Sequence, residues 1–573
     1  MKTLLKRNYI IYFLLFLATS VSLIVSNLSY DAEYQLSMGY RLIKGDIPII
    51  EMWEPNQTSA FIVAILMKIY ISITGTTTGI VLYIHFVGYL IRVGIACFLY
   101  HVIQKKVGMI PAIMAGFIYI LIGPKDILVP EYSNMEVWFS TLSVLFLIQY
   151  FEKKKFVHFI FSAVCLCLGV IAYPSFILTY FVVIFFLWKQ ECNQIREIFI
   201  YTGICAALGI SYVLYLMGGK DIEIVINSLI AALSIEPTHT VSAMEKVWTH
   251  IKSVGTMAGS VLGICAIGFL AEWISKYINE KKTGQPYKLS KEKWMLYSWY
   301  VLMGCFLINI LQVVRNGFHH FPILFIVLLG MRKQNLLQGA EKKVYQLGLT
   351  MGLATLFSTI VLSDHPFIHS TPYMMTAVVF SVIPLYRWYE ELSENKTWKK
   401  MFGYGVHLCL LLVMFRGIYV HTPIQGRGQA YSIAQDMSLI RTGPAMGIIT
   451  NEAGAAMQRD SYAEFQKWIQ PGDTIWILGE PVDTLGYLYQ DVEVGAPSVM
   501  STPTYNNDLL FYWEINPDKY PDVVIVSSGF GTLAYEMLTN EWLMNWLEEE
   551  YQAQTVIDGN YWRYYFKETR EFK

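Results

Sequence analysis

The chain has 573 residues, of which 54% are hydrophobic and only 15% charged, and its formal net charge is −1. A soluble domain carries roughly 25% charged residues, so this deficit indicates that most of the chain lies in lipid. The near-zero charge leaves no basic surface for nucleic acid, and no such partner is expected. The eight cysteines lie in or beside apolar segments without CxxC spacing, so neither a disulfide framework nor a cysteine metal site is predicted.

The N-terminal segment predicts a first membrane span. Lys2, Lys6 and Arg7 precede an apolar run over residues 9–25. The run is long and no small-x-small site follows it, which favours an uncleaved span over a cleaved signal peptide. The basic flank places the N-terminus in the cytoplasm. A polar stretch over 27–57 follows. The apolar segment 58–74 then carries Lys68 and ends in GTTTG, which predicts a helix lying at the membrane interface.

Twelve further apolar segments predict membrane spans, since a span needs about 20 apolar residues and fewer where the helix is short. They lie at about 80–103, 109–122, 136–151, 156–172, 174–188, 197–217, 248–275, 294–312, 321–331, 344–362, 373–386 and 401–420. With the first span they make thirteen. The predicted fold class is therefore mainly α, with a polytopic transmembrane domain over residues 1–420.

The charges of the predicted loops support this arrangement. With the N-terminus inside, the inner loops contain the stretch 276–293 and Lys105, Lys106, Lys153, Lys154, Lys155, Lys189, Arg196, Arg332, Lys333, Lys342, Lys343, Arg387, Lys396, Lys399 and Lys400. The outer loops contain only Arg41, Lys44, Lys125, Lys220, Lys246 and Arg315. This is a positive-inside pattern. Counting 58–74 as a span would reverse it, which is the reason for the interfacial interpretation.

The chain changes character after Val420. Short apolar runs at 474–478 and 523–527 alternate with amphipathic stretches at 462–469 and 533–549, which predicts a small α/β domain over 421–573. Residues 555–566 predict a hairpin around Asp558-Gly559-Asn560. An odd number of spans places this domain outside the cytoplasm. It contains no GxGxxG, P-loop or nucleophile elbow, so its predicted role is to cover an active site or bind an acceptor.

The first outer segment contains candidate catalytic residues. Asp31 directly follows the first span, and Glu33, Tyr34 and Arg41 come after it. A carboxylate at the membrane surface can accept a proton from a substrate hydroxyl, or bind a metal ion, beside a substrate whose tail stays in lipid. Outer loops also carry acids simply because they are wet, and for any single acid that interpretation is the simpler one. The combination of acids, aromatics and an interfacial helix favours a site.

The second outer segment, residues 123–136, adds Glu131, Tyr132 and Glu136. Ser133 or Asn134 would cap the next span, which would place Glu136 in a first helical turn where the dipole favours an acid. This structural interpretation and a functional one, in which Glu136 faces Asp31 across a cleft, stay open.

A third outer segment contains Arg315, His319 and His320 before a predicted span. One cation and two imidazoles at a helix start suit a phosphate, although a polar loop with interfacial histidines fits the same residues. The connection over 218–247 is long, and predicts either a mobile lid or a simple loop.

In these residues the chain resembles the GT-C superfamily of membrane glycosyltransferases, which includes the protein O-mannosyltransferases and the lipid A aminoarabinose transferase. The similar features are an acid after the first span, a Gly-x-x-Pro stretch before an interfacial helix, a second acid at the mouth of a later span and an Arg…His-aromatic stretch. The first acid is Asp31, with Tyr34 after it, and Gly45 and Pro48 form the Gly-x-x-Pro stretch. The second acid is Glu136, and Arg315 with His320 corresponds to the Arg…His-aromatic stretch. Two departures are that Glu33 is displaced by one from the common Asp-Glu pair, and that Tyr173 stands where a lysine often precedes Pro174.

The resemblance implies transfer of a sugar from a polyprenyl-phosphate-linked donor to an extracytoplasmic acceptor, which is a cell-surface glycan, a lipid or a protein. Asp31 would be the base or would orient the acceptor, and Glu136 would assist it or hold a metal. Arg315 and His320 would offset the charge of the phosphate. Further residues expected to bind substrate are Glu33, Tyr34, Arg41, Glu131, Tyr132 and His319. The sequence neither requires nor excludes a divalent metal ion, and it points to no other cofactor.

A transporter or flippase of lipid-linked sugars is the main alternative outside the enzymes. Such proteins tend to show internal repeats and ionisable residues at mid-membrane. Here no clear repeat is found, and Arg92, Glu272 and Arg416 lie mostly towards span ends. A surface-polymer polymerase or ligase would also use outer Arg and His residues but needs no acid after the first span. A sensor with a ligand-binding outer domain would not need thirteen spans.

Overall fold

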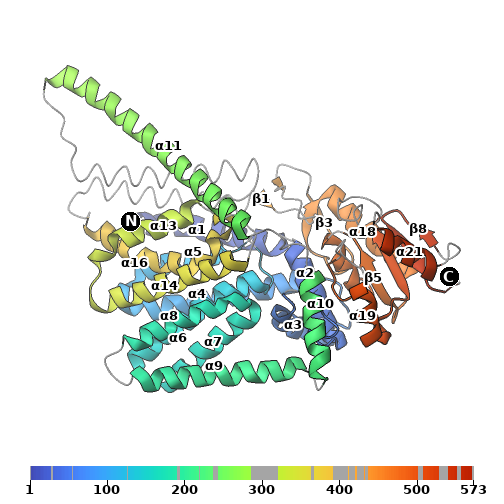
Figure 1. Cartoon of the computed structure of the whole chain (residues 1–573). Helices are drawn as coiled ribbons and strands as arrows, with labels where there is room; N and C mark the ends of the chain where they lie inside the picture. The colour runs from blue at the N-terminus through green and yellow to red at the C-terminus, as the bar shows by residue number, and fades with distance from the viewer. Residues whose placement is uncertain are drawn as a thin grey trace.

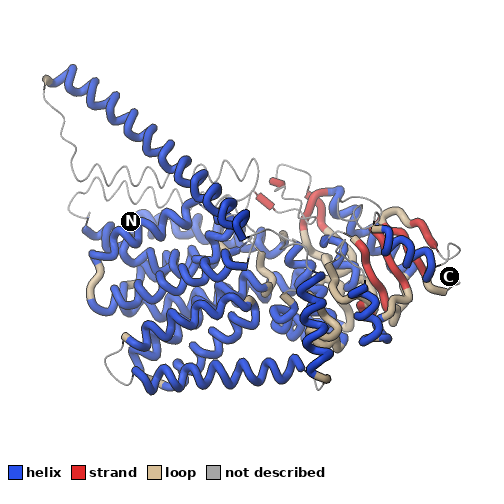
Figure 2. The backbone as a smooth tube through the Cα atoms, viewed as in Figure 1, coloured by secondary structure: helices blue, strands red, loops and turns tan. Residues whose placement is uncertain are grey.

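The computed structural model describes residues 2–26, 30–54, 56–124, 127–189, 194–217, 220–235, 243–284, 321–362, 367–391, 411, 414, 420–421, 431–432, 437–479, 481–500, 507–527, 540–551, 556–568 and 570. Most of the described chain is helical, and the strands gather near the C-terminus (Figure 2). The helices form a bundle, and the strand-containing part, called the sheet domain below, lies at one end of that bundle (Figure 1). The mainly α class with a C-terminal sheet region is confirmed.

The helical region follows the apolar pattern of the sequence. Its long helices are α1 (Lys2–Val25), α2 (Tyr30–Lys44), α3 (Ala60–Thr74), α4 (Ile80–Val107), α5 (Met109–Leu121), α6 (Tyr132–Lys153), α7 (Phe156–Ala172), α8 (Leu178–Trp188), α9 (Gln194–Met217), α10 (Ile222–Ile235), α11 (Ala243–Thr283), α13 (Phe321–Lys333), α14 (Gly339–Leu362) and α16 (Met375–Glu391). Short elements are η1 (Gln57–Ser59), η3 (Pro174–Ile177), η5 (Gln334–Leu336), α15 (Phe367–Ser370) and η6 (Thr371–Met374).

The predicted spans fall on these helices where the chain is described. By length and composition, four described helical segments are apolar enough to cross a membrane: Gln57–Thr74, Ile80–Val107, Gln194–Met217 and Gly339–Val361. Shorter apolar helices, such as α5 and α7, lie in the bundle beside them. The predicted span 294–312 and most of 401–420 lie outside the described residues, so the count of thirteen stays a prediction.

Two stretches that the sequence analysis left without a helix are helical. The first is α2, within the predicted polar stretch 27–57; its first turn carries Asp31 and Glu33 and its last turn carries Arg41 and Lys44. Acids at the start and cations at the end match the helix dipole, and this signal was overlooked. The second is α10, within the connection 218–247, which was expected to be a lid or a loop. Its run of 14 mostly apolar residues is long enough for an amphipathic helix.

The helices α2, α3 and α10 lie between the bundle and the sheet domain, and α10 turns sharply away from the direction of α9 (Figure 1). Gly39 allows close packing of α2 on α3, because a Cβ there would meet Val63 at 2.8 Å. Both α3 and α10 expose a stripe of isoleucines at helical spacing: Ile65, Ile69, Ile73, and Ile222, Ile226, Ile230. Segment 57–74 is long and apolar enough to span, yet its position and exposed stripe support the interfacial interpretation.

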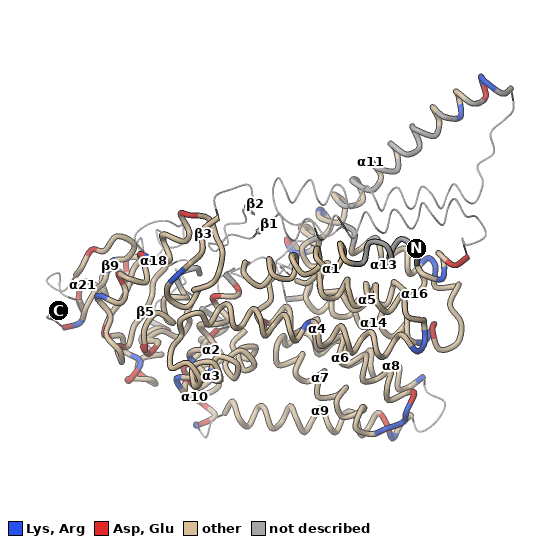
Figure 3. The backbone as a smooth tube through the Cα atoms, turned by 180° about the vertical axis from the view of Figure 1, so that it is seen from behind, with Lys and Arg blue, Asp and Glu red and all other residues tan. Residues whose placement is uncertain are grey.

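Cations of the predicted inner loops gather at the bundle end far from the sheet domain, where α1 also begins (Figures 1 and 3). Ion pairs connect several of these turns, including Lys106 with Glu152 and Arg387 with Glu341. The middle of the bundle carries few charges (Figure 3). Within the described part of the chain, most of these cations thus lie at one end of the bundle and the sheet domain lies at the other, while those in α11 lie on its tip, which projects away from the bundle.

The sheet domain is an α/β unit. Its five-stranded sheet has the order β6-β5-β7-β9-β8, in which β5 (Thr474–Leu478) is parallel to β6 (Glu493–Val494) and β7 (Val523–Ser527). The predicted hairpin is confirmed, since β8 (Val556–Asp558) pairs antiparallel with β9 (Trp562–Phe566). Further elements are β1 (Val420–His421), β2 (Tyr431–Ser432), β3 (Met437–Leu439), β4 (Ile449–Asn451), α18 (Glu452–Trp468), η8 (Pro481–Leu488), α19 (Asn507–Ile515), η9 (Pro517–Lys519) and α21 (Glu541–Glu550).

The sheet domain and the first outer segment share one hydrophobic core. That core joins strand residues such as Ile475 and Val524 to Leu36 and Met38 of α2, Val63 of α3 and further residues of α4. A second core fills the helical bundle. The predicted border at residue 420 therefore divides the chain by sequence, whereas α2 and α3 pack with the residues that follow it.

Candidate active site

Asp31 lies in the first turn of α2, at the end of that helix next to α6. Its carboxylate accepts a hydrogen bond of 3.0 Å from the hydroxyl of Tyr132, the first residue of α6. The Tyr132 ring stacks on Tyr173, with centroids 5.9 Å apart and planes at 16°. Asp31 and Tyr132 are both partly exposed. The structure thus joins the first and second outer segments through these two predicted site residues.

Glu33 and Tyr34 lie on the buried sides of α2, with exposed fractions of 0% and 4%. The backbone carbonyl of Glu33 accepts from Ser37, whose hydroxyl also contacts the carbonyl of Thr484 at 2.7 Å. Tyr34 belongs to the core shared with the sheet domain. These two residues are therefore adjacent to Asp31 in sequence but lie beneath the sheet domain.

Glu131 is the N-cap of α6. Its carboxylate accepts from the backbone N–H groups of Ser133 at 2.9 Å and Asn134 at 2.8 Å. The expectation that Ser133 or Asn134 caps this helix is wrong, because the carboxylate of Glu131, two residues before Ser133, accepts from the orphan backbone donors of the first turn. Asn134 instead accepts from Arg92 at 3.1 Å. The hydroxyl of Ser133 accepts from Tyr373 at 2.6 Å, which brings η6 to the start of α6.

Glu136 lies one turn further into α6 and is fully buried. Its carboxylate accepts from the hydroxyls of Ser358 and Thr359 on α14, the latter at 3.0 Å. Glu136 is therefore not in the first turn of α6, where the dipole was expected to favour it. Its hydrogen bonds point into the bundle, and no described hydrogen bond joins it to Asp31.

Arg41 lies at the other end of α2 and is fully buried. Its guanidinium donates to Asp46 at 2.6 Å and Glu54 at 2.8 Å, and also to the carbonyl of Pro497 at 3.1 Å. Burial by itself lowers the pKa of Arg41, but the negative charges of Glu54 and Asp46 outweigh it and raise that pKa. The planar five-donor fork suits this set of acceptors. Arg41 was predicted to bind substrate; here it holds the first outer segment to the sheet domain.

Lys519 extends the same network from the sheet domain. Its ammonium lies 2.6 Å from Asp46 and 3.4 Å from Glu493. At the surface beside it, Lys44 lies 2.8 Å from Asp491, and this hydrogen bond lowers the pKa of Asp491. The last turn of α2 is therefore tied to the sheet domain by charge as well as by the shared core.

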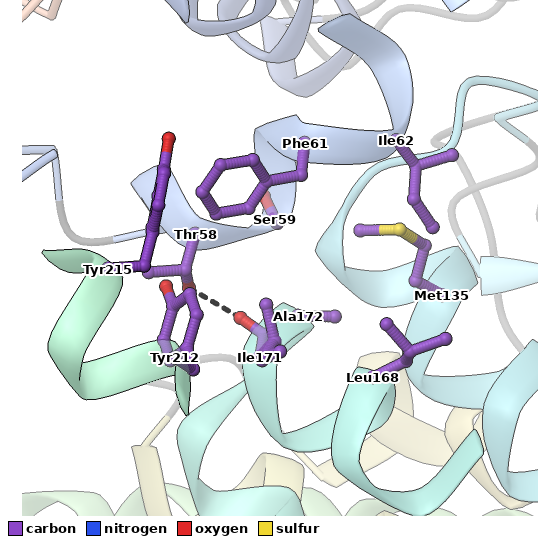
Figure 4. A pocket seen from close by; sticks show the side chains of 10 residues that line it. All are labelled: Thr58, Ser59, Phe61, Ile62, Met135, Leu168, Ile171, Ala172, Tyr212 and Tyr215. Atoms are coloured by element: carbon purple, nitrogen blue, oxygen red, sulfur yellow. Dashed lines mark hydrogen bonds between the residues drawn. The ribbon is translucent and has the colours of Figure 1, made fainter. Parts of the chain in front are cut away.

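An apolar pocket of about 320 Å³ lies in the helical region (Figure 4). Its walls come from η1, α3, α6, α7 and α9, and include Phe61, Met135, Leu168 and Tyr212. Met135 lies one helical turn after Tyr132, and the lining residue Ala172 immediately precedes Tyr173. The pocket and the Asp31–Tyr132–Tyr173 group thus share α6 and the end of α7 as their supports. The sequence analysis named none of its apolar lining residues, because they look like ordinary span residues.

Arg315, His319 and His320 lie outside the described residues, so their predicted role at a phosphate stays a prediction. Among the described residues, no group of three or more His, Cys, Asp or Glu side chains is placed to hold a metal ion. Within the described part of the chain, the candidate site thus consists of Asp31, Tyr132 and Tyr173, together with the apolar pocket that Met135 and Ala172 help to line.

No known protein family and no curated protein sequence matches the chain. Among solved structures, an oligosaccharyltransferase from Archaeoglobus fulgidus tethered to an acceptor peptide is similar over 96% of this chain and 72% of that one, with 10% identity and a TM-score of 0.47. Its apo form is similar over 90% of this chain and 69% of that one, with 11% identity and a TM-score of 0.42. The archaeal oligosaccharyltransferase AglB from Archaeoglobus fulgidus, bound to an inhibitory peptide and a dolichol-phosphate, is similar over 96% of this chain and 73% of that one, with 9% identity and a TM-score of 0.45.

These solved structures are of a membrane glycosyltransferase of the GT-C superfamily, the superfamily that the sequence resembles.

Proposed function

We propose that the chain is an integral membrane glycosyltransferase that moves a sugar from a polyprenyl-phosphate-linked donor to an extracytoplasmic acceptor. The observation that best supports this is the position of Asp31. Among the described acids that were predicted to act in the site, Glu33, Glu131 and Glu136 are fully buried, while Asp31 is partly exposed. Its partner Tyr132 begins α6, and Met135, one turn later in that helix, lines the apolar pocket.

Asp31 acts as the general base in this proposal. The acceptor nucleophile loses its proton to the carboxylate while its lone pair forms a bond to the anomeric carbon of the sugar. The bond between that carbon and the phosphate oxygen breaks, and the lipid phosphate leaves with the electron pair. A base placed within hydrogen-bond reach contributes roughly 10²- to 10⁴-fold to such a rate.

The apolar pocket holds the first isoprene units of the donor. Its lining is almost entirely hydrocarbon, with Thr58 and Ser59 at one side. Burial of each CH₂ group contributes about 0.8 kcal/mol, so a few units give useful affinity. Binding the donor beside Asp31 brings both reactants to one place at the membrane surface, which replaces a bimolecular encounter with an oriented one.

The remaining roles follow the resemblance. Arg315, with His319 and His320, offsets the charge of the leaving phosphate. Glu136 supports the site through α6 rather than by direct contact with Asp31, because its carboxylate is bound to α14. The sugar is a hexose or a pentose, and the acceptor is a cell-surface glycan, a lipid or a protein.

The proposed topology has thirteen spans, a cytoplasmic N-terminus and the sheet domain outside. It is supported by the cations that gather at the bundle end opposite the sheet domain (Figure 3). Asp31 and the pocket then lie at the extracytoplasmic surface, where polyprenyl-phosphate carriers present their sugars. The sheet domain, over residues 421–573, covers the site and contributes to acceptor binding.

The decisive experiment uses Asp31→Asn in the full chain, purified in detergent with a polyprenyl-phosphate sugar and membrane acceptor. We expect sugar transfer to fall at least 100-fold while the protein accumulates normally. The matched control is Asp221→Asn, an exposed acid between α9 and α10, which should retain activity. Full activity of Asp31→Asn would contradict the proposed role of Asp31 as general base. Product formation in detergent also separates the enzyme from a flippase, which moves lipid across a bilayer without forming product.

A further inference from the structure

A second pocket lies at the opposite end of the helical bundle from the sheet domain. It has a volume of about 370 Å³ and is formed where the ends of α4, α6 and α8 meet the start of α14. Its polar wall contains Lys106, Lys189, Lys343 and Glu152. The proposed transfer reaction uses none of these residues. This pocket is called the basic pocket below.

The basic pocket carries an excess of positive charge. Lys106 lies 3.6 Å from Glu152 and is largely neutralised by it. Within the described part of the chain, no carboxylate lies within ion-pair distance of Lys189 or Lys343. The ammonium of Lys189 instead lies over the ring of Phe185, 4.3 Å from its centroid. Two lysines in the pocket wall are thus left for an anion.

The helix dipoles explain only part of this arrangement. Lys106 is in the last turn of α4 and Lys189 follows the last residue of α8, where cations offset the dipole. Lys343 is close to the start of α14, where the dipole gives a cation no gain. The positive-inside pattern accounts for a cation at this end of the bundle, and the pocket brings Lys343 and Lys189 into one wall, where both can contact the same anion.

The rest of the lining points to an amphipathic ligand. Phe151, Phe186 and Leu347 form an apolar wall beside the lysines. A free phosphate ion gains nothing from such a wall, whereas a phospholipid places its phosphate against the cations and its upper acyl chain against the aromatics. Basic pockets between membrane helices on the cytoplasmic side bind anionic headgroups in this way. The positive-inside pattern places the basic pocket at that surface.

We propose that the basic pocket binds the phosphate of an anionic membrane phospholipid, such as phosphatidylglycerol, with Lys189 and Lys343 as its main cationic contacts. The basic pocket lies at the far end of the bundle from α2, which carries Asp31, so the proposed lipid site is separate from the proposed transfer site (Figures 1 and 3). Bound lipid would join the ends of α8 and α14, which carry the two lysines.

The test compares lipid retention by native mass spectrometry for the full chain in micelles containing phosphatidylglycerol or phosphatidylcholine. We expect selective retention of phosphatidylglycerol, and a loss of roughly tenfold or more in the Lys189→Gln/Lys343→Gln variant. The matched control is Lys105→Gln/Lys155→Gln, which removes the same charge from exposed lysines outside the pocket. Inorganic phosphate and glycerol phosphate are added as soluble competitors.

Retention by the control variant together with loss in the pocket variant supports the proposal. Equal loss in both variants would show only general surface attraction and would overturn it. Displacement of the lipid by either soluble phosphate at similar concentration would also overturn it, since the apolar wall would then add nothing. Sugar transfer by the pocket variant reports separately on the proposed enzyme activity.

Discussion

At the start of α2, Asp31 is partly exposed and accepts one hydrogen bond from Tyr132, whereas at its end Arg41 is fully buried between Asp46 and Glu54. Both are charged residues of the same amphipathic helix, about three turns apart. The first contacts α6 of the bundle, and the second contacts the sheet domain. The same helix thus presents a reactive group at one end and an anchor at the other.

This difference shows how the position of a charge decides its use. A carboxylate that keeps some contact with water stays accessible to a substrate. A guanidinium taken fully out of water must have all of its partners built into the fold, because an unpaired buried charge is costly. The predictions below test the anchored end and the reactive end of α2 separately.

The largest effect on stability is expected for Arg41→Met. This change leaves the buried carboxylate of Glu54 without its cationic partner and takes one of two such partners from Asp46, which keeps Lys519. Breaking a buried ion pair costs about 3–5 kcal/mol. Native-state hydrogen exchange of β5 and β7 amides should show the corresponding loss of protection. Lys44→Met is the control, since Lys44 pairs at the surface and should cost under about 1 kcal/mol. Equal protection in Arg41→Met and Lys44→Met would contradict the anchoring role.

At the reactive end, Tyr132→Phe removes the described hydrogen bond to Asp31. A hydrogen bond to a charged group contributes about 1.5–3 kcal/mol, so we expect transfer to fall roughly tenfold or more in kcat with the donor KM nearly unchanged. The acidic limb of the pH–rate profile should move upward, because the carboxylate loses a donor that favours its charged form. Tyr215→Phe, which keeps the aromatic wall of the pocket, is the control. An unchanged profile would exclude Tyr132 as a positioning residue.

A smaller effect is expected from narrowing the apolar pocket with Leu168→Trp. The larger ring occupies space proposed for an isoprene unit, and losing a little more than one buried CH₂ costs about 1 kcal/mol, or roughly fivefold in KM. Steady-state kinetics with a long and a short polyprenyl donor provide the comparison. The short donor should be less affected. A uniform fall in kcat for both donors would indicate that the pocket does not bind the tail.

The smallest effect concerns Asp491 at the surface of the anchored end. Lys44 lowers its pKa below the ordinary value of 3.8, so the stabilisation is present above that value and is lost as the pH falls through the lowered pKa. The side chain of Asp491 is 71% exposed, which limits the contribution to under about 1 kcal/mol. The unmodified protein should melt at a higher temperature than the Lys44→Gln variant, and this difference should become smaller as the pH is lowered. A melting-temperature difference that becomes larger as the pH is lowered would contradict the stabilisation of ionised Asp491 by Lys44.

The sequence analysis was most successful where a feature is local. The apolar runs at 156–172, 474–478 and 523–527 appear as α7, β5 and β7, and the Asp-Gly-Asn turn produces the C-terminal hairpin. It missed α2 and α10, because a polar outer segment and a long connection were both taken as loops. It also placed the N-cap of α6 at Ser133 or Asn134 instead of Glu131, because all three side chains offer an oxygen that can accept from the backbone N–H groups of a first helical turn.

The opening inference from composition, that most of the chain belongs in lipid, agrees with a bundle of apolar helices whose charges lie mainly at its ends. The sequence by itself determined the class of fold, the apolar helices and the strands, because these depend on hydrophobic periodicity and turn chemistry within short windows. Only the tertiary structure decided that Asp31 meets Tyr132, that Glu136 faces α14 and that Arg41 is an anchor. Those outcomes depend on contacts between residues far apart in the sequence, such as Arg41 and Pro497, which are 456 positions apart, and no local pattern records them.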